Sequence, residues 1–420
     1  MAKRSPREAV SNCLSEMFDC GHACTVPHGT SGLRNNVLVE TGETATSNTD
    51  ATPTVISSRR VLLADSRFHP ARIEMVGGRI RSIAPLSAGE TPSCESMLVP
   101  GFVDVQVNGI EDVDVWAMAL DRDVSAWQKI SDYLLDQGVT SWCPTLVTAP
   151  LEHYRPALDF LREVAKDGQG RARSMGVHLE GPFLGTAPGA HRVELICNPD
   201  AEWMERHLDG VALLTMGAES VGAPRLAAMA RTFGAAVSIG HSRPTRPQFS
   251  ALVDAGAGLV THLFNAMSGT HHREPGLAAW ALIDSRVCAS LIADGVHVAP
   301  EMIALAFAAK PGGMVLVTDA VAVRSNRVGS WRLSVIDGAP RLDDGTLAGS
   351  VSTMPEALSA CVRSAGVPVV QAVRAATFHP ARVLGRFDRG QLQSGCLADV
   401  VALKDDCSIA GVWLSGRQVR

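Results

Sequence analysis

Eight short apolar runs, each ending in polar or small residues, mark the middle of the chain, and most are followed by a stretch typical of a helix. They are LVPGFVDVQVN (98–108), VTSWCPTLV (139–147), SMGVHLE (174–180), VALLTMGAE (211–219), AVSIGH (236–241), GLVTH (258–262), ASLIADGVH (289–297) and MVLVTD (314–319). Near-continuous apolar strands that alternate with helices are typical of a parallel sheet buried on both faces. Eight such units predict an α/β fold, a closed (β/α)8 TIM barrel. The GxGxxG fingerprint expected in the first turn of an open dinucleotide-binding sheet is missing.

Both ends of the chain differ in sequence pattern from the middle, because they consist of short β-branched runs broken by turn residues. VISSRRVLLAD and ARIEMVGGRIRSIAP, with Gly77 and Gly78 at a predicted hairpin turn, lie before the barrel, and GVWLSGRQVR ends the chain. Because chain ends often lie close together, we expect residues 54–98 and 380–420 to form one small β-sandwich domain. The barrel is then expected over residues 99–379.

Residues 1–53 show no sustained hydrophobic period and are expected to be a disordered extension, or to follow a misplaced start codon. They contain a group of potential metal ligands, Cys13, Cys20, His22, Cys24 and His28. The spacing of these residues matches no zinc-ribbon pattern, which argues against a second metal site here.

Composition narrows the class of protein. The chain has 420 residues, 46% of them apolar, and a net charge of −5, with no long basic run that would bind nucleic acid or an anionic membrane. No segment is apolar for long enough to span a membrane, and the basic N-terminus lacks an apolar signal region. The ten scattered cysteines fit reduced thiols better than a disulfide framework. We therefore expect a cytoplasmic protein with a small-molecule ligand.

Five titratable residues fall at or just after the carboxyl ends of five predicted strands: Glu180, His241, His262, His297 and Asp319. In a barrel these ends converge on one mouth, where active sites of this fold lie. One carboxylate and two imidazoles suit a zinc-like cation with an open coordination position. Glu180, His241 and His262 are the predicted ligands. Asp319 is the predicted catalytic acid and base, and His297 could polarise a carbonyl or hold a substrate hydroxyl.

Eight motifs follow one another along the chain in a fixed order: PGFVDVQVNG, HLEGPFL, GHS, THLFNAM, REPGL, ADGVHV, VTDA and LAGSVSTM. From about residue 55 to the C-terminus, the chain resembles the N-acetylglucosamine-6-phosphate deacetylases of the amidohydrolase superfamily. The resemblance implies removal of the acetyl group from an amino sugar phosphate, yielding glucosamine 6-phosphate and acetate. It assigns to Glu180, His241, His262 and Asp319 the same roles that their positions suggest.

The resemblance also implies which residues contact the substrate. These are Gln106, Asn108, Gly181, Ala190, His191, Asn265, Ala266, Arg273, Asp294, Gly295, Val296, Ala348, Gly349 and Ser350. Arg273 should meet the 6-phosphate, and a guanidinium suits bidentate phosphate recognition. In relatives the neighbouring subunit supplies this arginine, so the resemblance implies a homodimer.

One departure from the wider superfamily concerns the number of metal ions. Many amidohydrolases carry His-x-His at the end of the first barrel strand, whereas this chain has Gln106 and Asn108 there. Amide side chains are poor ligands for zinc-like ions. We therefore predict one divalent ion per subunit, Zn²⁺ before Fe²⁺, Co²⁺ or Mn²⁺.

Two other functions stay open. The chain could deacetylate N-acetylgalactosamine 6-phosphate or hydrolyse another N-acyl compound, such as an N-acyl amino acid or a cyclic ureide. It could instead be a catalytically silent scaffold, although such proteins typically lose metal ligands and this set is complete. The pathway served, cell-wall recycling or amino sugar catabolism, does not follow from the sequence.

Overall fold

The computed structural model describes residues 52–166, 170–198, 200–323, 327–328 and 331–420. Nearly all of the predicted extension, with its cysteines and histidines, lies outside the described residues. Thr49–Arg420 forms one compact unit, so the predicted boundary between the small domain and the barrel stays a prediction.

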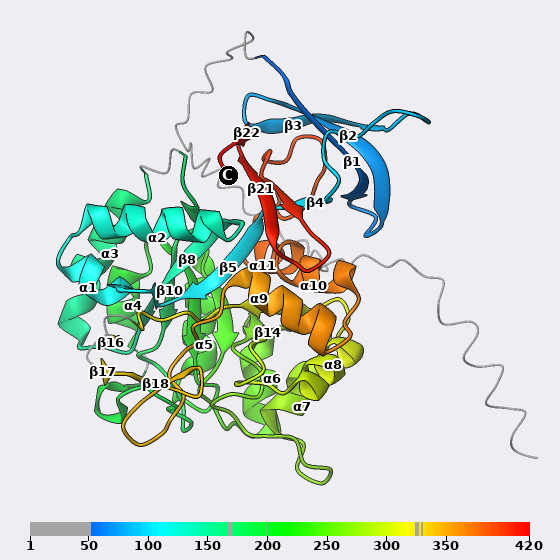
Figure 1. Cartoon of the computed structure of the whole chain (residues 1–420). Coiled ribbons are helices and arrows are strands. Elements are labelled where there is room, and N and C mark those ends of the chain that lie inside the picture. Colours follow the sequence, from blue (N-terminus) through cyan, green and yellow to red (C-terminus); the bar gives the residue numbers. More distant parts are fainter. Residues whose placement is uncertain (1–51, 167–169, 199, 324–326, 329–330) are drawn as a thin grey trace, which may run out of the picture. The chain divides into compact units, whose positions relative to one another are not determined.

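Eight parallel strands form the barrel, in the order in which they occur along the chain (Figure 1). They are β5 (Phe102–Val107), β8 (Val139–Val147), β10 (Val177–Glu180), β11 (Val211–Met216), β12 (Ala236–Ile239), β13 (Ala257–Val260), β14 (Cys288–Ile292) and β15 (Met314–Val317). A bridge between Val107 and Ala320 brings the last strand back to the first. The predicted TIM barrel is confirmed.

Helices follow the strands, as a parallel barrel requires. They are α1 (Val115–Leu120), α2 (Val124–Asp136), α3 (Leu151–Val164), α4 (Ala201–His207), α5 (Ala223–Thr232), α6 (Arg246–Asp254), α7 (Gly276–Ile283), α8 (Pro300–Ala309), α9 (Met354–Ser359), α10 (Val369–Ala375) and α11 (Phe378–Val383). A 3₁₀ turn covers Val193–Leu195, and a π-helical segment, Ala360–Ser364, follows α9. In the described part of the chain, no helix is long and apolar enough to cross a membrane.

A seven-stranded sheet combines the two ends of the chain. Its order is β22 (Arg417–Gln418), β21 (Ile409–Leu414), β20 (Val400–Leu403), β4 (Met97–Pro100), β1 (Thr54–Leu62), β2 (Phe68–Val76) and β3 (Arg79–Pro85). Gly77 and Gly78 both have positive φ angles and form the two-residue turn between β2 and β3, which confirms the predicted hairpin. Strands β1 and β20 both pair with β4, so that the N-terminal and C-terminal segments share one sheet.

Short strands complete the chain. They are β6 (Gly109–Ile110), β7 (Val113–Asp114), β9 (Arg173–Ser174), β16 (Arg327–Val328), β17 (Trp331–Arg332), β18 (Ser334–Ile336) and β19 (Ala339–Arg341). Strand β9 pairs with β8, and the others form two-stranded hairpins.

The first predicted run, 98–108, was wrong as a single strand. It divides at Gly101 into β4, which belongs to the end sheet, and β5, which begins the barrel. The Gly101 N–H donates to the carbonyl of Asp399. A Cβ atom at Gly101 would lie 2.2 Å from the Thr140 hydroxyl oxygen, so only glycine fits where the chain passes between the two sheets. Both halves are fully buried, and the hydrophobic pattern therefore could not reveal the break.

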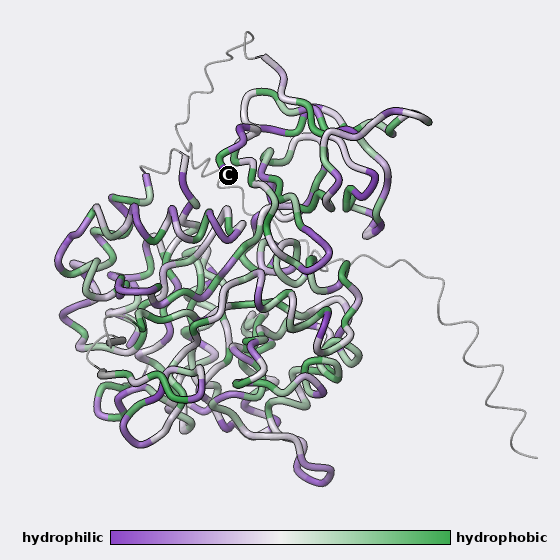
Figure 2. Tube along the Cα trace, in the orientation of Figure 1, coloured by the Kyte–Doolittle hydropathy of each residue, from purple (hydrophilic) through white to green (hydrophobic). Residues whose placement is uncertain are grey.

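Hydrophobic burial stabilises the barrel on both sides of its wall. Inside, Val103, Val105, Leu213, Val315 and Val317 belong to one apolar cluster. Outside, a larger cluster joins the strands to the inner faces of the helices. Figure 2 shows the helices alternating between hydrophobic and hydrophilic stretches, as expected for helices with one buried face.

A buried ion pair connects the end sheet to the barrel. Arg173 on β9 donates to Asp399, beside β20, at 2.6 Å, and the Asp399 side chain is only 4% exposed. The second carboxylate oxygen of Asp399 accepts the backbone N–H of Ser415 at 2.9 Å. Removing one member of a buried pair leaves the other charge without a partner.

We expect Asp399→Ala to lower the free energy of unfolding by about 3 kcal/mol, the lower end of the range for breaking a buried pair, because Arg173 is partly exposed. Urea denaturation would measure the change. Asp405→Ala is the control, because its pair with Arg60 is exposed, at 78% and 40%, and should change stability little. Equal losses of unfolding free energy in both variants would contradict the claim that burial makes the Arg173–Asp399 pair stabilising.

Candidate metal centre and active site

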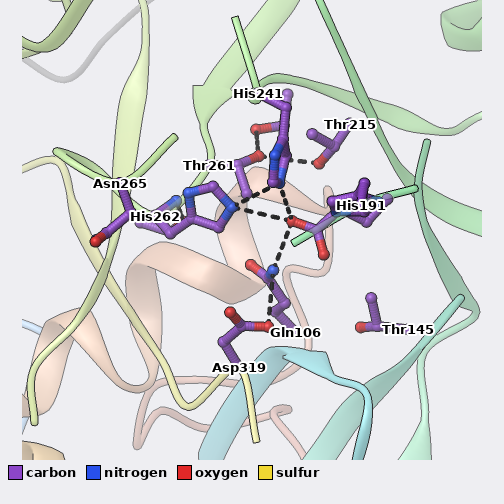
Figure 3. Close-up of polar contacts among 12 residues, drawn as sticks. Gln106, Thr145, His191, Thr215, His241, Thr261, His262, Asn265 and Asp319 are labelled. Atoms are coloured by element: carbon purple, nitrogen blue, oxygen red, sulfur yellow. Dashed lines mark hydrogen bonds and ion pairs between the residues drawn. The ribbon is translucent and has the colours of Figure 1, made fainter. Parts of the chain in front are cut away.

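Three side chains from the barrel strands β10, β12 and β13 converge at one point. Glu180 ends β10, and His241 and His262 lie two residues beyond β12 and β13. The Glu180 Oε1 atom lies 3.2 Å from His241 Nε2 and 3.1 Å from His262 Nε2, and the two nitrogens are 3.0 Å apart. All three side chains are at most 6% exposed. Figure 3 shows the two imidazoles pointing at the same carboxylate.

The backbone at this mouth is strained. His241 (φ 50°), His262 (φ 30°) and Asp319 (φ 50°) all adopt left-handed conformations, which L residues rarely occupy. Gly240 precedes His241, and a Cβ atom there would lie 2.6 Å from a methyl carbon of Thr215. The sharp turn after each strand directs the side chain inward. Such strain occurs most often at functional sites.

The hydrogen bonds of His241 determine its tautomer, that is, which ring nitrogen carries the proton. Its Nδ1 atom lies 3.2 Å and 3.1 Å from the carbonyl oxygens of Ala187 and Pro188. Carbonyls only accept, so the proton of the neutral ring belongs on Nδ1. The Nε2 lone pair therefore points at Glu180, another acceptor. Two acceptors at this distance repel each other unless a proton or a cation lies between them.

Electrostatics favour positive charge at this point, which a protonated imidazole or a bound cation would supply. Burial would raise the pKa of Glu180, but its hydrogen bonds with the two histidines hold that pKa well below the ordinary value. Burial would lower the pKa of His262, yet the hydrogen bond to Glu180 and its charge raise it. The His262 Nδ1 atom is buried and has no partner among the described residues. The donor set, one carboxylate and two imidazoles, fits a zinc-like ion, for which such ligands are typical.

His191 lies beside this group, but its hydrogen bonds differ from those of His241. A ring nitrogen of His191 lies within 4.8 Å of ligand atoms of Glu180 and His241, so these three also form a possible metal-binding group. The backbone N–H of Thr148 donates to His191 Nδ1 at 3.3 Å, and the Thr148 hydroxyl lies 2.8 Å from the same atom. Burial lowers the pKa of His191 well below its usual value, so the ring is neutral. Its proton then lies on Nε2, which makes His191 a hydrogen-bond donor and leaves His262 as the better third ligand.

Two amide side chains hold Asp319 next to the metal-binding group. Gln106 Nε2 donates to Glu180 Oε1 at 2.8 Å and to Asp319 Oδ1 at 3.1 Å, as Figure 3 shows. Asn108 Nδ2 donates to the same Asp319 oxygen at 2.6 Å. Burial, with the nearby negative charge of Glu180, raises the pKa of Asp319 to about 7. A carboxyl group with this pKa can both accept and return a proton near neutral pH.

His297 is held by Asp294, three residues earlier. The Asp294 carboxylate accepts the backbone N–H of His297 at 2.7 Å and lies 2.7 Å from its Nδ1 atom. This contact orients the ring and places the Nδ1 proton toward Asp294, so Nε2 remains for a ligand. Burial would raise the pKa of Asp294, but the hydrogen bond from His297 lowers it.

A cavity of about 820 Å³ opens above these side chains. Among its lining residues are many of the predicted site residues, namely Asn108, Glu180, Ala190, His191, His241, His262, Asn265, Ala266, His297, Asp319, Ala348 and Gly349. The sequence therefore predicted most of the floor. It gave no signal for the wall, which includes Trp116, Leu120, His153 and Arg341. These residues lie in α1, α3 and β19, in segments without a recognisable motif.

The other predicted residues lie outside the described cavity lining. Gln106 lies beneath it, and the Ser350 hydroxyl donates to the Thr318 carbonyl. Gly181, with φ of 97°, lies against Thr148, where a Cβ atom would be 2.3 Å from the hydroxyl. Asp294, Gly295 and Val296 form the turn before His297, and Asp294 reaches the site only through its contact with the His297 ring.

Arg273 is also away from the cavity of its own chain. Residues 269–275, between β13 and α7, are all exposed. Figure 2 shows this loop as hydrophilic. A single chain therefore does not bring Arg273 into its own cavity.

A belt of hydroxyl groups lies just below the metal-binding group. His178 Nε2 is 2.8 Å from the Thr215 hydroxyl, which is 2.9 Å from that of Thr261, and Thr261 is 2.5 Å from Ser238. Burial lowers the pKa of His178 to about 4 and keeps it neutral. The belt links the neighbouring strands β10 to β13, which carry or flank the ligands. Figure 3 labels two of its members, Thr215 and Thr261. The sequence analysis missed it, because single threonines in strands are common.

Comparisons with known proteins agree with this geometry. The model of the amidohydrolase family matches residues 97–419. The N-acetylglucosamine-6-phosphate deacetylase of Bos taurus is 35% identical over 342 residues, which cover 77% of this chain and 83% of the relative. The N-acetylgalactosamine-6-phosphate deacetylase of Escherichia coli O157:H7 is 31% identical and is covered to 98% of its length, against 86% of this chain.

Solved structures show the same fold. The N-acetylglucosamine-6-phosphate deacetylase of Thermotoga maritima superposes with a TM-score of 0.80 at 27% identity, covering 87% of this chain and 99% of that one. The Mycobacterium smegmatis enzyme, solved in complex with N-acetyl-D-glucosamine 6-phosphate, gives 0.79 at 31% identity, with 88% and 99% covered. The chain therefore belongs to the amidohydrolase family and, within it, to the N-acetylglucosamine-6-phosphate deacetylases.

Proposed function

We propose that this protein hydrolyses the acetamide of N-acetylglucosamine 6-phosphate to glucosamine 6-phosphate and acetate. One observation carries the proposal: Glu180, His241 and His262 converge within about 3 Å of one another, with the buried Asp319 carboxyl held beside them by Gln106. A metal-binding group next to an acid and base of suitable pKa is what amide hydrolysis requires. The intact ligand set argues against a silent scaffold.

The metal-binding group would hold a single divalent ion, Zn²⁺ before Fe²⁺, Co²⁺ or Mn²⁺. When bound, such an ion activates water and polarises the amide carbonyl. Gln106 and Asn108 stand in place of the His-x-His pair that would help to hold a second ion, and both donate amide N–H groups to Asp319. Amide side chains are poor ligands for zinc-like ions. These contacts support one ion per subunit.

The side chains of the chain itself account for the proton transfers. Asp319 takes a proton from the attacking water and returns it to the nitrogen as the amine leaves. His297, whose Nδ1 atom is oriented by Asp294, donates from Nε2 when protonated and stabilises negative charge on the carbonyl oxygen. His191 donates from Nε2 to a polar group of the sugar. Asn108 Oδ1, buried and without a partner in the described part of the chain, offers an acceptor to the substrate.

The 6-phosphate would be bound by Arg273 of a second copy of this chain. The exposed loop 269–275 presents the guanidinium outward, away from the cavity of its own subunit. A homodimer in which these loops are exchanged would complete both sites. A cytoplasmic location agrees with a phosphorylated substrate and stays a prediction.

N-acetylgalactosamine 6-phosphate is the second candidate substrate. The Escherichia coli relative named for that sugar aligns over nearly its whole length. The two sugars differ only in the configuration at C4, and no described residue of the cavity has been assigned to that hydroxyl.

Acetate release from both sugar phosphates and from unphosphorylated N-acetylglucosamine tests the function directly. We expect the gluco phosphate to be the best substrate, activity to disappear with a chelator, and one equivalent of Zn²⁺ per chain to restore it. Mass spectrometry of the native protein would count the ions. A requirement for two ions, or equal rates with the unphosphorylated sugar, would contradict the proposal.

Asp319→Asn should lower kcat by about 10²-fold or more, as expected for loss of a general acid and base. Metal content should not change, because Asp319 is not among the three ligands. Steady-state kinetics with elemental analysis would measure both. Asp254→Asn is the control, since Asp254 ends α6 and is 66% exposed. Near-normal turnover by a metal-loaded Asp319→Asn protein would disprove the assigned role.

Arg273→Ala should raise KM for the phosphorylated sugar about 10- to 100-fold, the value of a charge-assisted hydrogen bond, and leave the unphosphorylated sugar unaffected. Mixing Arg273→Ala with Asp319→Asn subunits tests the exchange across the dimer. One site of each mixed dimer would contain both Asp319 and a partner's Arg273, so the rate at substrate concentrations far below the raised KM should increase on mixing. Mixtures no faster than the two variants alone would show that Arg273 acts within its own chain or not at all.

A further inference from the structure

The seam between the first and the last strand of the barrel lacks a continuous hydrogen-bonded ladder. In the described part of the chain, hydrogen-bonded ladders join every other neighbouring pair of strands, but β5 and β15 share only the isolated bridge between Val107 and Ala320. At the lower end of the seam, main-chain groups bond to other partners. The Val103 N–H donates to Ala376, and His379 donates to the carbonyl of Met314 at 2.7 Å. Backbone pairing of the two edges is thus confined to the end of the seam that carries the bridge.

A buried carboxylate fills the middle of this seam. Asp104, on β5, is 0% exposed. Its Oδ2 atom accepts the hydroxyl of Thr318 at 2.6 Å, and its Oδ1 atom accepts the backbone N–H groups of Gln106 at 3.2 Å and of Thr318 at 3.4 Å. These bonds reach both edges of the seam. Asp104 thereby takes the place of the missing rungs of the ladder.

The residues on either side of this contact are those that position the proposed acid and base. Gln106 and Asn108 follow Asp104 on one edge, and Asp319 follows Thr318 on the other. Their side chains meet across the seam, where two amide N–H groups contact one oxygen of Asp319. The Asp319 N–H donates to the Gln106 carbonyl at 3.0 Å, and the Asn108 N–H donates to the Ala320 carbonyl at 2.8 Å. These main-chain bonds join the two edges of the seam beside the site. A shift of one edge relative to the other would separate Asp319 from its amide partners.

We propose that Asp104, acting through Thr318, is a positioning residue for Asp319. It fixes the first and last strands at the point where the barrel would otherwise open, and so sets the distance between Asp319 and the metal-binding group. Burying a carboxylate is costly unless hydrogen bonds compensate, and no step of the proposed reaction uses this one. The inference rests on the proposed role of Asp319.

Four variants separate positioning from simple stabilisation. Asp104→Ala removes all three acceptor contacts, and Asp104→Asn keeps one acceptor oxygen. Thr318→Val removes the hydroxyl at almost constant volume, whereas Thr318→Ser keeps it. Each protein would be assayed for kcat, KM and melting temperature after its metal content has been confirmed.

We expect Asp104→Ala to lower kcat at least tenfold with KM changed less than threefold, because misplacement of a reacting group by about 1 Å can cost about 100-fold. Asp104→Asn should recover part of the loss. Thr318→Val should be slow and Thr318→Ser close to wild type. The double variant Asp104→Ala with Thr318→Val should be no slower than Asp104→Ala alone, because the hydroxyl acts through the carboxylate.

His379→Gln is the matched control, since His379 lies at the lower end of the same seam, away from the cavity. It should lower the melting temperature and leave kcat of the metal-loaded protein unchanged. An equal loss of kcat in His379→Gln, or a kcat within twofold of wild type in both Asp104→Ala and Thr318→Val, would overturn the inference. If Asp104→Ala does not fold, the comparison of kcat between Thr318→Val and Thr318→Ser tests the inference. Full activity of Asp319→Asn would instead refute the proposed role of Asp319, so the two failures are distinguishable.

Discussion

The crowding of one carboxylate and two imidazoles is the constraint on which the site depends. Glu180, His241 and His262 bring a carboxylate oxygen and two ring nitrogens to within 3.0–3.2 Å of one another in a buried place. Such an arrangement is unfavourable by itself and becomes favourable only around positive charge. The barrel has to supply the rigidity that holds them together. The hydroxyl belt beneath them, the turns after β12 and β13, and the carbonyls that contact His241 all serve this purpose.

The same rigidity separates the roles of neighbouring polar groups. His191 and His241 are close together, yet Thr148 directs the lone pair of one ring nitrogen of His191 away from the metal-binding group, and backbone carbonyls do the opposite for His241. Gln106 lies between Glu180 and Asp319 and donates to both. The roles of His191 and His241 thus follow from the hydrogen bond on the far side of each ring, as is general for metal sites.

The sequence predicted the barrel, the shared end sheet and the main site residues, because each depends on local signals. Apolar runs with polar ends are local, and Glu180, His241, His262 and Asp319 stand where such runs end. The break at Gly101 could not be predicted, since buried strands on both sides look alike. The tautomers of His191 and His241, and the contact of Asp104 with Thr318 across 214 residues, depend on partners distant in the chain. The role of Arg273 rests on the motif alone and stays a prediction, because the residue is exposed in the single chain.

The left-handed backbone at His241, His262 and Asp319 would link the abundance of the protein to the supply of the proposed metal ion. Conformations that L residues avoid raise the free energy of the folded state, and the clustered acceptors raise it further. A cation bound by the folded chain and not by the unfolded one returns stability in proportion to its free concentration. Cells short of the ion would therefore contain a looser protein at greater risk of proteolysis, so that starvation for metal would reduce the amount of enzyme as well as its activity.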